Sequence, residues 1–326
     1  MKILHIVPGH DDPTCGIAVA AKMIAASQRK KGHTVRTGIR LAVSDFEWAD
    51  EVWVHSMWTP TVFRGCLGAI RAKKPLVRMT HGCADPLKMA YHWWKKRWVA
   101  PLERWFFRRT DRVVVTCADE FHQVYAFALG VKRIEQMDLG RLAVNSIAQS
   151  ECLRPMVFRP IRRKRDGMRL LFIGRLHPLK GLDILIDVLT KVNRPDVSLT
   201  VIGRDEKGLR VVYEKQAKGF PVQFLGVVEE PVKQSVMDES DVLVLPTLSE
   251  NFGLVVAEAL ERGKRVITTD GAPVWDPGMY ENGVGVGYGG QLLYLKGFRD
   301  GTWEERVRLL KEAITMMGDE QNLNES

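Results

Sequence analysis

The stretch that most constrains the fold is residues 241–270, DVLVLPTLSENFGLVVAEALERGKRVITTD. Residues 241–246 form a short apolar run ending in proline, and we interpret it as a buried strand. Residues 247–251 are a polar loop, residues 253–262 have helical composition, and residues 265–268 are the next strand. This order predicts a βαβ unit whose loop opens at the carboxyl end of a parallel strand, where ligands of such folds bind.

Two carboxylates mark this unit. Glu250 ends the loop and Glu258 lies within the helix, with seven residues between them. If the helix starts near Gly253, Glu250 precedes its N-terminus and Glu258 lies about two turns further on. A helix N-terminus offers unpaired N–H groups and the positive end of a dipole, which suits a diphosphate, whereas carboxylates suit sugar hydroxyls. The combination predicts a site for a sugar nucleotide.

The same alternation of strands and helices runs through both halves of the chain. We predict strands at residues 2–7, 51–55, 75–80, 112–116, 169–173, 198–202, 222–225 and 292–295, and helices at residues 17–31, 60–73, 118–129, 181–192, 207–218, 231–238 and 302–317. Residues 132–165 show no clear periodicity, and the linker is placed near residues 155–167. We therefore expect an α/β chain of two doubly wound parallel sheets, in domains 1–160 and 161–326, with a cleft between them.

Two cations follow the first strand of the second half. FIGRLHPLKG, residues 172–181, places Arg175 and Lys180 in the loop between a strand and a helix. There they can bind a leaving diphosphate, Arg through its planar fork and Lys as a point charge. Two solvated loop charges would be the better interpretation of such a pair alone. Glu250 and Glu258 at another strand end of the same half favour the binding site.

These motifs resemble a known family. The resemblance is to the retaining glycosyltransferases of family four, which have the GT-B fold, and it rests on Gly174, Arg175, Lys180, Gly181, ENFGLVVAEAL with Glu250 and Glu258, Gly263 and Val266. The first half adds Gly16 in the loop after the first strand and His81 with Gly82 after a later one. The chain departs from the family at Cys15, where a glycine is expected. The family's usual Pro-Asn-Gly turn ahead of the linker is also absent, and residues 138–140, Asp-Leu-Gly, lie near its place. The family's last helix, which returns to the first domain, is not evident.

The resemblance implies two Rossmann-like domains and a role for each residue. Arg175 and Lys180 would bind the diphosphate, Glu258 the ribose and Glu250 the sugar, with backbone N–H groups of residues 251–254 nearby. The implied catalytic residues are Glu250, His81, Arg175 and Lys180. The implied donor-binding residues are Gly16, Arg175, Lys180, Glu250, Asn251, Phe252, Gly253, Leu254 and Glu258. The resemblance further implies a hexose-type donor linked to UDP or GDP, retention of configuration, and neither a metal nor another cofactor.

Residues 91–112, YHWWKKRWVAPLERWFFRRTDR, predict a basic helix rich in aromatic side chains. Such a helix can lie in an anionic membrane interface, or it can pack its aromatic face against a sheet as an ordinary core helix. Nucleic-acid stacking ranks last, because no nucleic-acid module accompanies the helix. Together with the resemblance, this favours a lipid-linked glycan acceptor, such as lipopolysaccharide core or a surface polysaccharide precursor. We expect a cytoplasmic protein, peripheral on the inner face of the membrane.

Other features narrow the classes of function. The net charge of +9 indicates affinity for anions without naming them, and five scattered cysteines indicate neither a disulfide framework nor a zinc site. The opening residues lead directly into a strand, so we expect no signal peptide. Gly285, Gly287 and Gly290 match a dinucleotide motif without its strand and helix, and residues 203–208 lack the P-loop lysine. A nucleotide-sugar epimerase of GT-B fold and a catalytically silent membrane-bound partner remain open.

Overall fold

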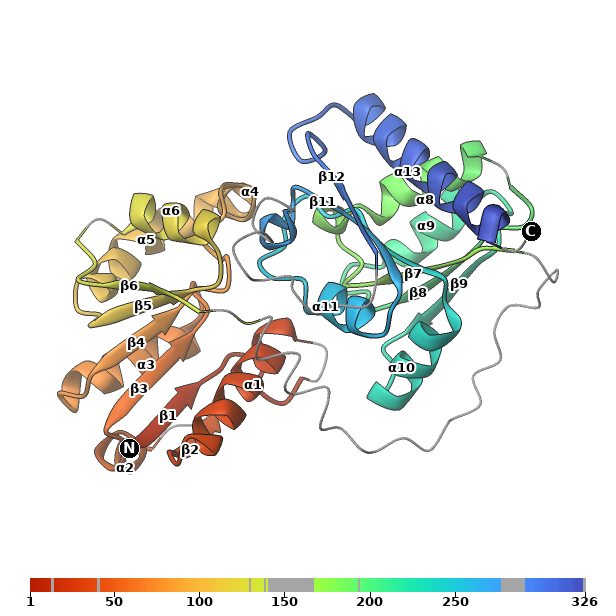
Figure 1. The fold of residues 1–326 in the computed structure, drawn as a ribbon. Helices are drawn as coiled ribbons and strands as arrows, with labels where there is room; N and C mark the ends of the chain where they lie inside the picture. The colour runs from red at the N-terminus through yellow and green to blue at the C-terminus, as the bar shows by residue number, and fades with distance from the viewer. Residues whose placement is uncertain are drawn as a thin grey trace. The chain divides into compact units, whose positions relative to one another are not determined.

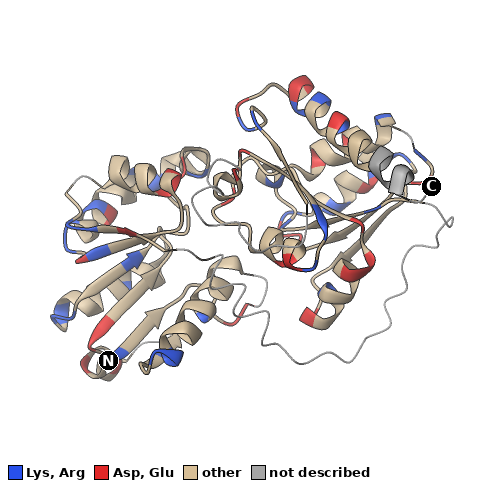
Figure 2. Cartoon of the chain, viewed as in Figure 1, with Lys and Arg blue, Asp and Glu red and all other residues tan. Residues whose placement is uncertain are grey.

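The computed structural model describes residues 1–12, 15–39, 42–128, 130–137, 139, 167–192, 194–276 and 291–324. The chain divides into two compact units, Met1–Ser146 and Ile147–Ser326. The predicted boundary at residues 160–161, most of the predicted linker and the glycines at 285, 287 and 290 lie outside the described residues. Acidic and basic side chains are interspersed over both units (Figure 2).

The first unit is a six-stranded parallel sheet in the order β2-β1-β3-β4-β5-β6 (Figure 1). Its strands are β1 (Lys2–Ile6), β2 (Thr34–Gly38), β3 (Glu51–His55), β4 (Leu76–Met79), β5 (Arg112–Val115) and β6 (Ile134–Gln136). Its helices are α1 (Gly16–Lys30), α2 (Val43–Trp48), α3 (Pro60–Arg71), α4 (Pro86–Ala90), α5 (Trp93–Phe107) and α6 (Ala118–Phe127). Leu4 and Ile6 of β1 pack with α2, α3 and α5, whereas Val7 packs with Ala18 and Ala21 of α1. Alternate side chains therefore serve opposite faces of the sheet.

Four elements of this unit, β2, α2, α4 and β6, were not predicted. Strand β2, TVRTG, buries only Val35 and lies at the edge of the sheet, so it lacks the apolar run of a central strand.

The predictions for Gly16 and residues 91–112 need correction. Gly16 is the first residue of α1 and not part of the loop, because the extended Cys15 forms the N-cap. The predicted basic helix is α5, which begins at Trp93 and ends at Phe107, and residue 112 already opens β5.

The second unit is also a six-stranded parallel sheet, in the order β12-β11-β10-β7-β8-β9. Its strands are β7 (Arg169–Ile173), β8 (Ser198–Ile202), β9 (Val222–Gly226), β10 (Val242–Leu245), β11 (Arg265–Thr269) and β12 (Leu292–Leu295). Its helices are η1 (Pro178–Lys180), α8 (Leu182–Val192), α9 (Leu209–Ala217), α10 (Glu230–Glu239), α11 (Leu254–Glu261), η2 (Pro273–Trp275) and α13 (Trp303–Asn324). Every strand and helix predicted for this half is present. Helix α13 packs along α8, with the Trp303 indole donating to Asp187 at 3.0 Å (Figure 1).

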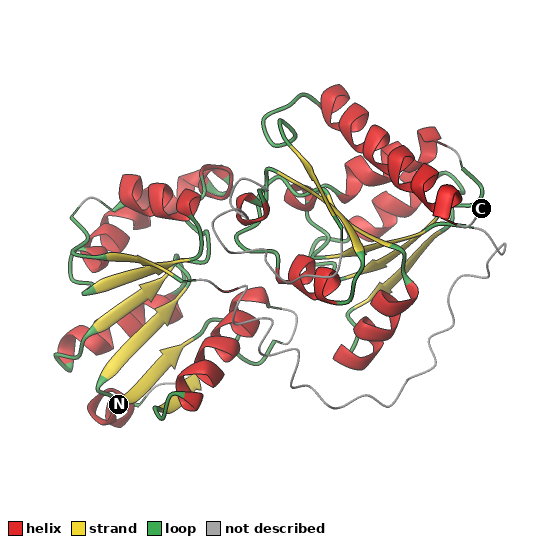
Figure 3. Ribbon diagram, in the orientation of Figure 1, coloured by secondary structure: helices red, strands yellow, loops and turns green. Residues whose placement is uncertain are grey.

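The strand orders confirm two doubly wound α/β sheets, each flanked by helices (Figure 3). In the second unit the chain moves outward from β7 through β8 and β9, then returns to place β10 on the other side of β7. The strand order reverses between β7 and β10. The loops that leave the carboxyl ends of these two strands part there, and open α/β sheets bind ligands at such a switch point.

Candidate active site

Two predicted site residues meet at this switch point. Lys180 is the last residue of η1, which follows β7, and Glu250 lies in the loop after β10. The Lys180 ammonium donates to Oε2 of Glu250, and the two side chains are 13% and 23% exposed. The sheet thus joins a cation and a carboxylate that lie seventy residues apart in sequence. Both side chains keep a small exposed fraction.

Backbone contacts hold the two loops together. The Leu248 N–H donates to the Leu179 carbonyl at 2.8 Å, and the Thr247 hydroxyl donates to the same oxygen at 3.0 Å. Gly181 has φ of +69°, and a Cβ there would collide with the carbonyl oxygen of Pro246. A glycine is required at this position both for its left-handed backbone and for the close approach of the β10 end. The geometry of the Lys180 loop therefore depends on the neighbouring loop.

The loop continues from Glu250 into helix α11. Oε1 of Glu250 accepts from the Asn251 N–H at 2.9 Å, and Gly253 turns the chain at φ +70° before Leu254 begins the helix. The Phe252 side chain is buried against the fully buried Trp275, whose indole N–H donates to the Phe252 carbonyl. The Phe252 side chain is therefore part of the core and is not available to a ligand.

Glu258 lies in α11 and bonds to a residue that the sequence did not single out. Its Oε2 is 2.8 Å from Nζ of Lys233 on α10, and Lys233 also contacts Oε1 of Glu230 at 2.9 Å. Burial raises the pKa of Glu258, although Lys233 opposes the shift. Burial would lower the pKa of Lys233, but the two carboxylates raise it above its ordinary value. Glu258 is thus fixed in place by one ammonium shared between two acids.

Arg175 contacts a different carboxylate from Lys180. Its side chain is 53% exposed, and its guanidinium is 3.7 Å from Oε2 of Glu206. Both cations influence His177, whose pKa is lowered by burial and then by Arg175 and Lys180. The loop after β7 therefore brings two cations close to His177, and Glu206 partly opposes them.

A cavity of about 290 Å³ lies at the carboxyl ends of β7, β8 and β9. Its lining consists of Leu176, Val201, Gly203, Arg204, Asp205, Arg210, Phe224, Gly226 and Val227. Asp205 accepts from the backbone N–H groups of Leu209 at 2.9 Å and Arg210 at 3.0 Å. A carboxylate therefore occupies the N-terminus of α9, where a P-loop would hold phosphate. This agrees with the rejection of residues 203–208 as a P-loop.

In the first unit, His81 sits in the loop after β4 with φ of +52°. A buried carboxylate holds this loop: Glu120 accepts from the Thr80 hydroxyl, from the Gly82 N–H at 2.6 Å and from the Thr116 N–H at 2.8 Å. Nε2 of His81 is 2.8 Å from Nδ1 of His55. His81 is therefore a partnered, buried histidine on a constrained loop.

Gly16, the other predicted site residue of the first unit, begins α1 with open space where a Cβ would project. No close approach of another part of the chain requires a glycine at this position among the described residues. Its role stays a prediction.

Helix α5 has two faces. Trp93, Trp94 and Trp98 are 59%, 55% and 81% exposed, whereas Phe106 and Phe107 are buried in the core. Core packing thus accounts for Phe106 and Phe107, whereas a membrane contact of the exposed tryptophans stays a prediction. On the buried face Glu103 pairs with Arg78 at 2.6 Å, both side chains being fully buried. None of the described helices is both long and apolar enough to cross a membrane.

Two family models match the chain. "Glycosyltransferase Family 4" matches residues 27–135 and "Glycosyl transferases group 1" matches residues 167–288, and together they span more than two thirds of the chain. The chain belongs to the GT-B glycosyltransferases of family four. The family and fold predicted from the sequence are confirmed.

Solved structures with this fold include WaaG, described as a glycosyltransferase involved in lipopolysaccharide biosynthesis. It is 16% identical, with a TM-score of 0.64 over 98% of this chain and 94% of that one. Anabaena HepE in complex with UDP and glucose is 18% identical, with a TM-score of 0.62 over 98% and 91% of the two chains. At these identities the likeness concerns the fold.

Relatives in sequence match over shorter stretches. A phosphatidyl-myo-inositol mannosyltransferase of Mycolicibacterium smegmatis is 38% identical over 113 residues, which is 32% of this chain and 28% of that protein. A 41.2 kDa protein in the cps region of Klebsiella pneumoniae is 26% identical over 68% of this chain and 60% of its own length. This family-four chain therefore spans less than two thirds of the sequence relatives it matches.

Proposed function

We propose that this chain is a retaining, metal-independent glycosyltransferase that moves a hexose-type sugar from a UDP- or GDP-linked donor to a lipid-linked glycan. The observation that carries the proposal is the Lys180–Glu250 pair at the switch point between β7 and β10. A cation for phosphate and a carboxylate for sugar hydroxyls stand there next to the start of α11. The UDP and glucose in the HepE structure support a nucleotide-sugar donor.

Each donor group has a chemical counterpart in the second unit. Lys180 and Arg175 take the diphosphate, with the α11 N-terminus beside them, and Glu250 accepts hydrogen bonds from sugar hydroxyls. Glu258, held by Lys233, accepts from the ribose hydroxyls. The cavity at the ends of β7, β8 and β9 offers room for the base.

The charges suit a departing diphosphate. As the sugar–phosphate bond breaks, negative charge grows on the phosphate and the sugar becomes oxocarbenium-like. Fixed cations stabilise that charge without reorganising, which is the role a metal plays in other transferases. The departing phosphate oxygen then takes the proton of the acceptor hydroxyl on the same face, so configuration is retained without an enzyme nucleophile. His81 contacts the donor sugar in this proposal, as the family resemblance implies.

The acceptor side of the proposal rests on helix α5. Three tryptophans project from it into solvent beside basic residues, and indole rings with neighbouring cations favour an anionic membrane interface. The names of the mannosyltransferase and of WaaG, which refer to a phosphoinositide and to lipopolysaccharide, support a lipid-linked acceptor. We propose a peripheral enzyme on the cytoplasmic face of the membrane.

A screen of nucleotide sugars by thermal shift tests the donor half, because a ligand of the folded state raises its apparent stability. We expect one UDP or GDP sugar to stabilise the protein. Lys180→Ala or Arg175→Ala should raise the activation free energy by about 2–4 kcal/mol, which lowers kcat/KM roughly 30- to 900-fold. Lys191→Ala, an exposed cation on α8, is the matched control. Full turnover in either variant would overturn the assignment. Inversion of the donor at C2 without transfer would indicate an epimerase instead.

Flotation with vesicles tests the membrane half. The full chain should bind vesicles of anionic lipid at low salt, and a Trp93→Ala, Trp94→Ala, Trp98→Ala triple variant should bind much less. A Val211→Ala, Val212→Ala variant removes exposed apolar side chains from α9 and serves as the control. Equal binding of the triple variant and the wild type would exclude α5 as the anchor.

A further inference from the structure

A continuous chain of hydrogen bonds connects three buried histidines, the last of which is His81. Nε2 of His81 is 2.8 Å from Nδ1 of His55, and Nε2 of His55 is 2.8 Å from Nδ1 of His5. Nε2 of His5 is 2.7 Å from the carboxamide oxygen Oε1 of Gln28. The neighbouring rings also stack, with centroids 5.1 Å apart in both steps. Four residues therefore form one connected unit that ends at a predicted catalytic side chain.

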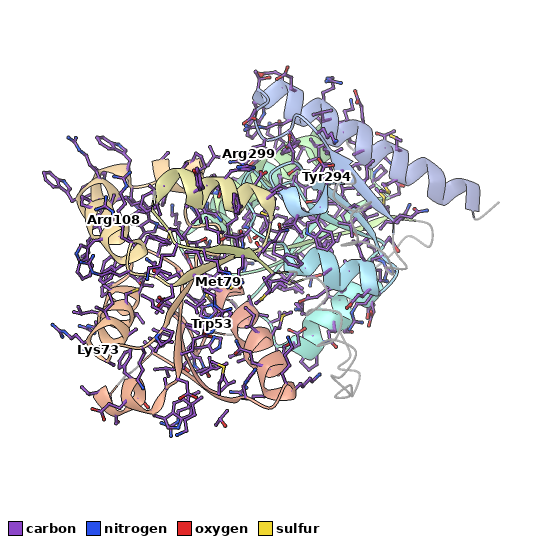
Figure 4. All side chains as sticks on the ribbon, turned by 60° about the vertical axis from the view of Figure 1, so that its left-hand side comes forward. Trp53, Lys73, Met79, Arg108, Tyr294 and Arg299 are labelled. Atoms are coloured by element: carbon purple, nitrogen blue, oxygen red, sulfur yellow. The ribbon has the colours of Figure 1, made fainter. Side chains whose placement is uncertain are left out.

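The fold aligns these side chains. His5 lies in β1, His55 ends β3, and His81 follows β4, so they come from three adjacent strands, while Gln28 comes from helix α1. Trp53 and Met79, labelled in Figure 4, mark the positions two residues before His55 and His81. His5 and His55 are fully buried and His81 is 7% exposed.

A metal site does not explain the cluster. Two imidazole nitrogens that share a zinc ion each lie about 2.0–2.1 Å from it. Facing nitrogens only 2.8 Å apart leave no room for an ion on the line between them, and this is the ordinary length of a hydrogen bond. The described residues also contain no group of three or more potential ligands that could hold a metal ion.

The surroundings keep all three rings neutral. Burial lowers the pKa of His5 to about 4, with Gln28 opposing the shift and Arg29 adding to it. Burial likewise lowers the pKa of His81 to about 4, with Glu120 opposing and Lys88 adding. The pKa of His55 lies well below its ordinary value because of burial and its two histidine neighbours. At neutral pH each ring therefore carries one N–H.

Neutral rings in such a chain have only two consistent arrangements. Each facing pair of atoms needs one proton, because two N–H groups would clash and two lone pairs would repel. If the Gln28 oxygen accepts from His5, then His5, His55 and His81 must all carry the proton on Nε2. If an N–H group faces His5 instead, all three must carry it on Nδ1. The state of one end therefore determines the state of the other.

We propose that Gln28 sets the tautomer of His81 through His5 and His55, so that Nδ1 of His81 is presented as a hydrogen-bond acceptor. Gln28, His5 and His55 are then positioning residues. An acceptor at this point favours a group that donates, such as a sugar hydroxyl, over a phosphate or carbonyl oxygen. This last step rests on the proposed function, whereas the coupling along the chain does not.

Two-bond ¹⁵N–¹H correlation spectra of the ¹⁵N-labelled full chain test the coupling, because they distinguish Nδ1–H from Nε2–H imidazoles. In the wild type at pH 7.5, His81 should show a protonated Nε2 and a bare Nδ1. Gln28→Met removes the acceptor and should give a mixture of tautomers at His81. Gln28→Lys offers only donors and should shift His81 toward Nδ1–H. Ser27→Lys adds the same charge one residue away and should leave the spectrum unchanged. A bare Nε2 in the wild type, or a His81 spectrum unaltered by both Gln28 variants, would overturn the proposal.

Turnover separates the coupling from the function. With the donor found in the thermal screen, Gln28→Lys should lower kcat/KM roughly tenfold, about the loss of one hydrogen bond. A shifted tautomer with unchanged turnover would leave the coupling standing and overturn the contact between His81 and the sugar. The full activity of Ser27→Lys would show that added charge alone is not responsible.

Discussion

Acid should destabilise the first unit because its three buried histidines are neutral in the folded protein. The perturbation is a change from pH 7.5 to pH 5. The sign follows from the depressed pKa values: the unfolded chain takes up protons below its ordinary pKa of 6.5, while folded His5 and His81 stay neutral down to about 4. Stability is therefore lost as the pH falls through this window, and it is recovered as the pH rises.

The magnitude follows from the same values. At pH 5 an unfolded histidine is almost fully protonated and a folded one with a pKa of about 4 is mostly neutral, which costs about 2 kcal/mol per residue. His5 and His81 together account for about 4 kcal/mol, and His55 adds to this. Such a loss is a large part of the roughly 5–15 kcal/mol that stabilises an ordinary domain.

Urea denaturation of the full chain at the two pH values measures this loss. Tryptophan fluorescence reports mainly on the first unit, which holds seven of the nine tryptophans. His5→Phe should reduce the difference between the two pH values by about 2 kcal/mol, whatever its effect on stability at pH 7.5. His122→Gln, at an exposed position on α6, should leave the difference unchanged. An equal pH difference in wild type and His5→Phe would refute the burial of neutral histidines.

The second unit yields further predictions. Lys233→Met leaves the buried Glu258 without its cation. The binding free energy of the nucleotide sugar, measured by calorimetry, should fall at least as much as the free energy of unfolding, measured by denaturation. Gly181→Ala forces a Cβ into a backbone carbonyl at a positive φ, and it should cost more than about 1 kcal/mol of unfolding free energy and also weaken donor binding. Trp275→Phe removes the indole N–H that bonds to the Phe252 carbonyl and leaves a smaller ring at a fully buried position, so more than about 1 kcal/mol should be lost in denaturation. Wild-type values in any of these measurements would contradict the corresponding contact.

Local patterns predicted most of the fold. The central strands of the second unit are apolar runs bounded by turns, such as VLVL in β10, and they were found in place because burial on both faces demands such a run. The edge strands β9 and β12 are less buried, yet each still contains apolar residues between turns. Strand β2 escaped prediction because an edge strand can be polar and bury a single valine. The exposed half of α5 and its buried half could not be told apart, since the aromatic residues on both look alike in sequence.

Contacts between residues far apart in sequence could not be predicted. Lys233 lies three residues after Glu230, a spacing that predicts an ordinary ion pair within one helix. Its contact with Glu258 forms only when α10 and α11 pack together. His5 and His55 are fifty residues apart and carry no motif. Their chain of hydrogen bonds could have been suspected only from a histidine within one apolar strand and a histidine at the end of another, where aliphatic side chains are expected.

The predicted site residues of the two units differ in how far the sequence describes them, and the difference has a structural reason. Lys180 and Glu250 were predicted because each lies in the segment that leaves the carboxyl end of a strand, so the sheet itself brings them to the same end of the strands. His81 also follows a strand, yet its chemistry depends on which nitrogen holds the proton, and that depends on partners in β1, β3 and α1. A residue type and a place in the fold thus suffice to propose a charge-based role for a residue such as Lys180. For a histidine they do not, because the same ring in the same place is a donor or an acceptor according to the network behind it.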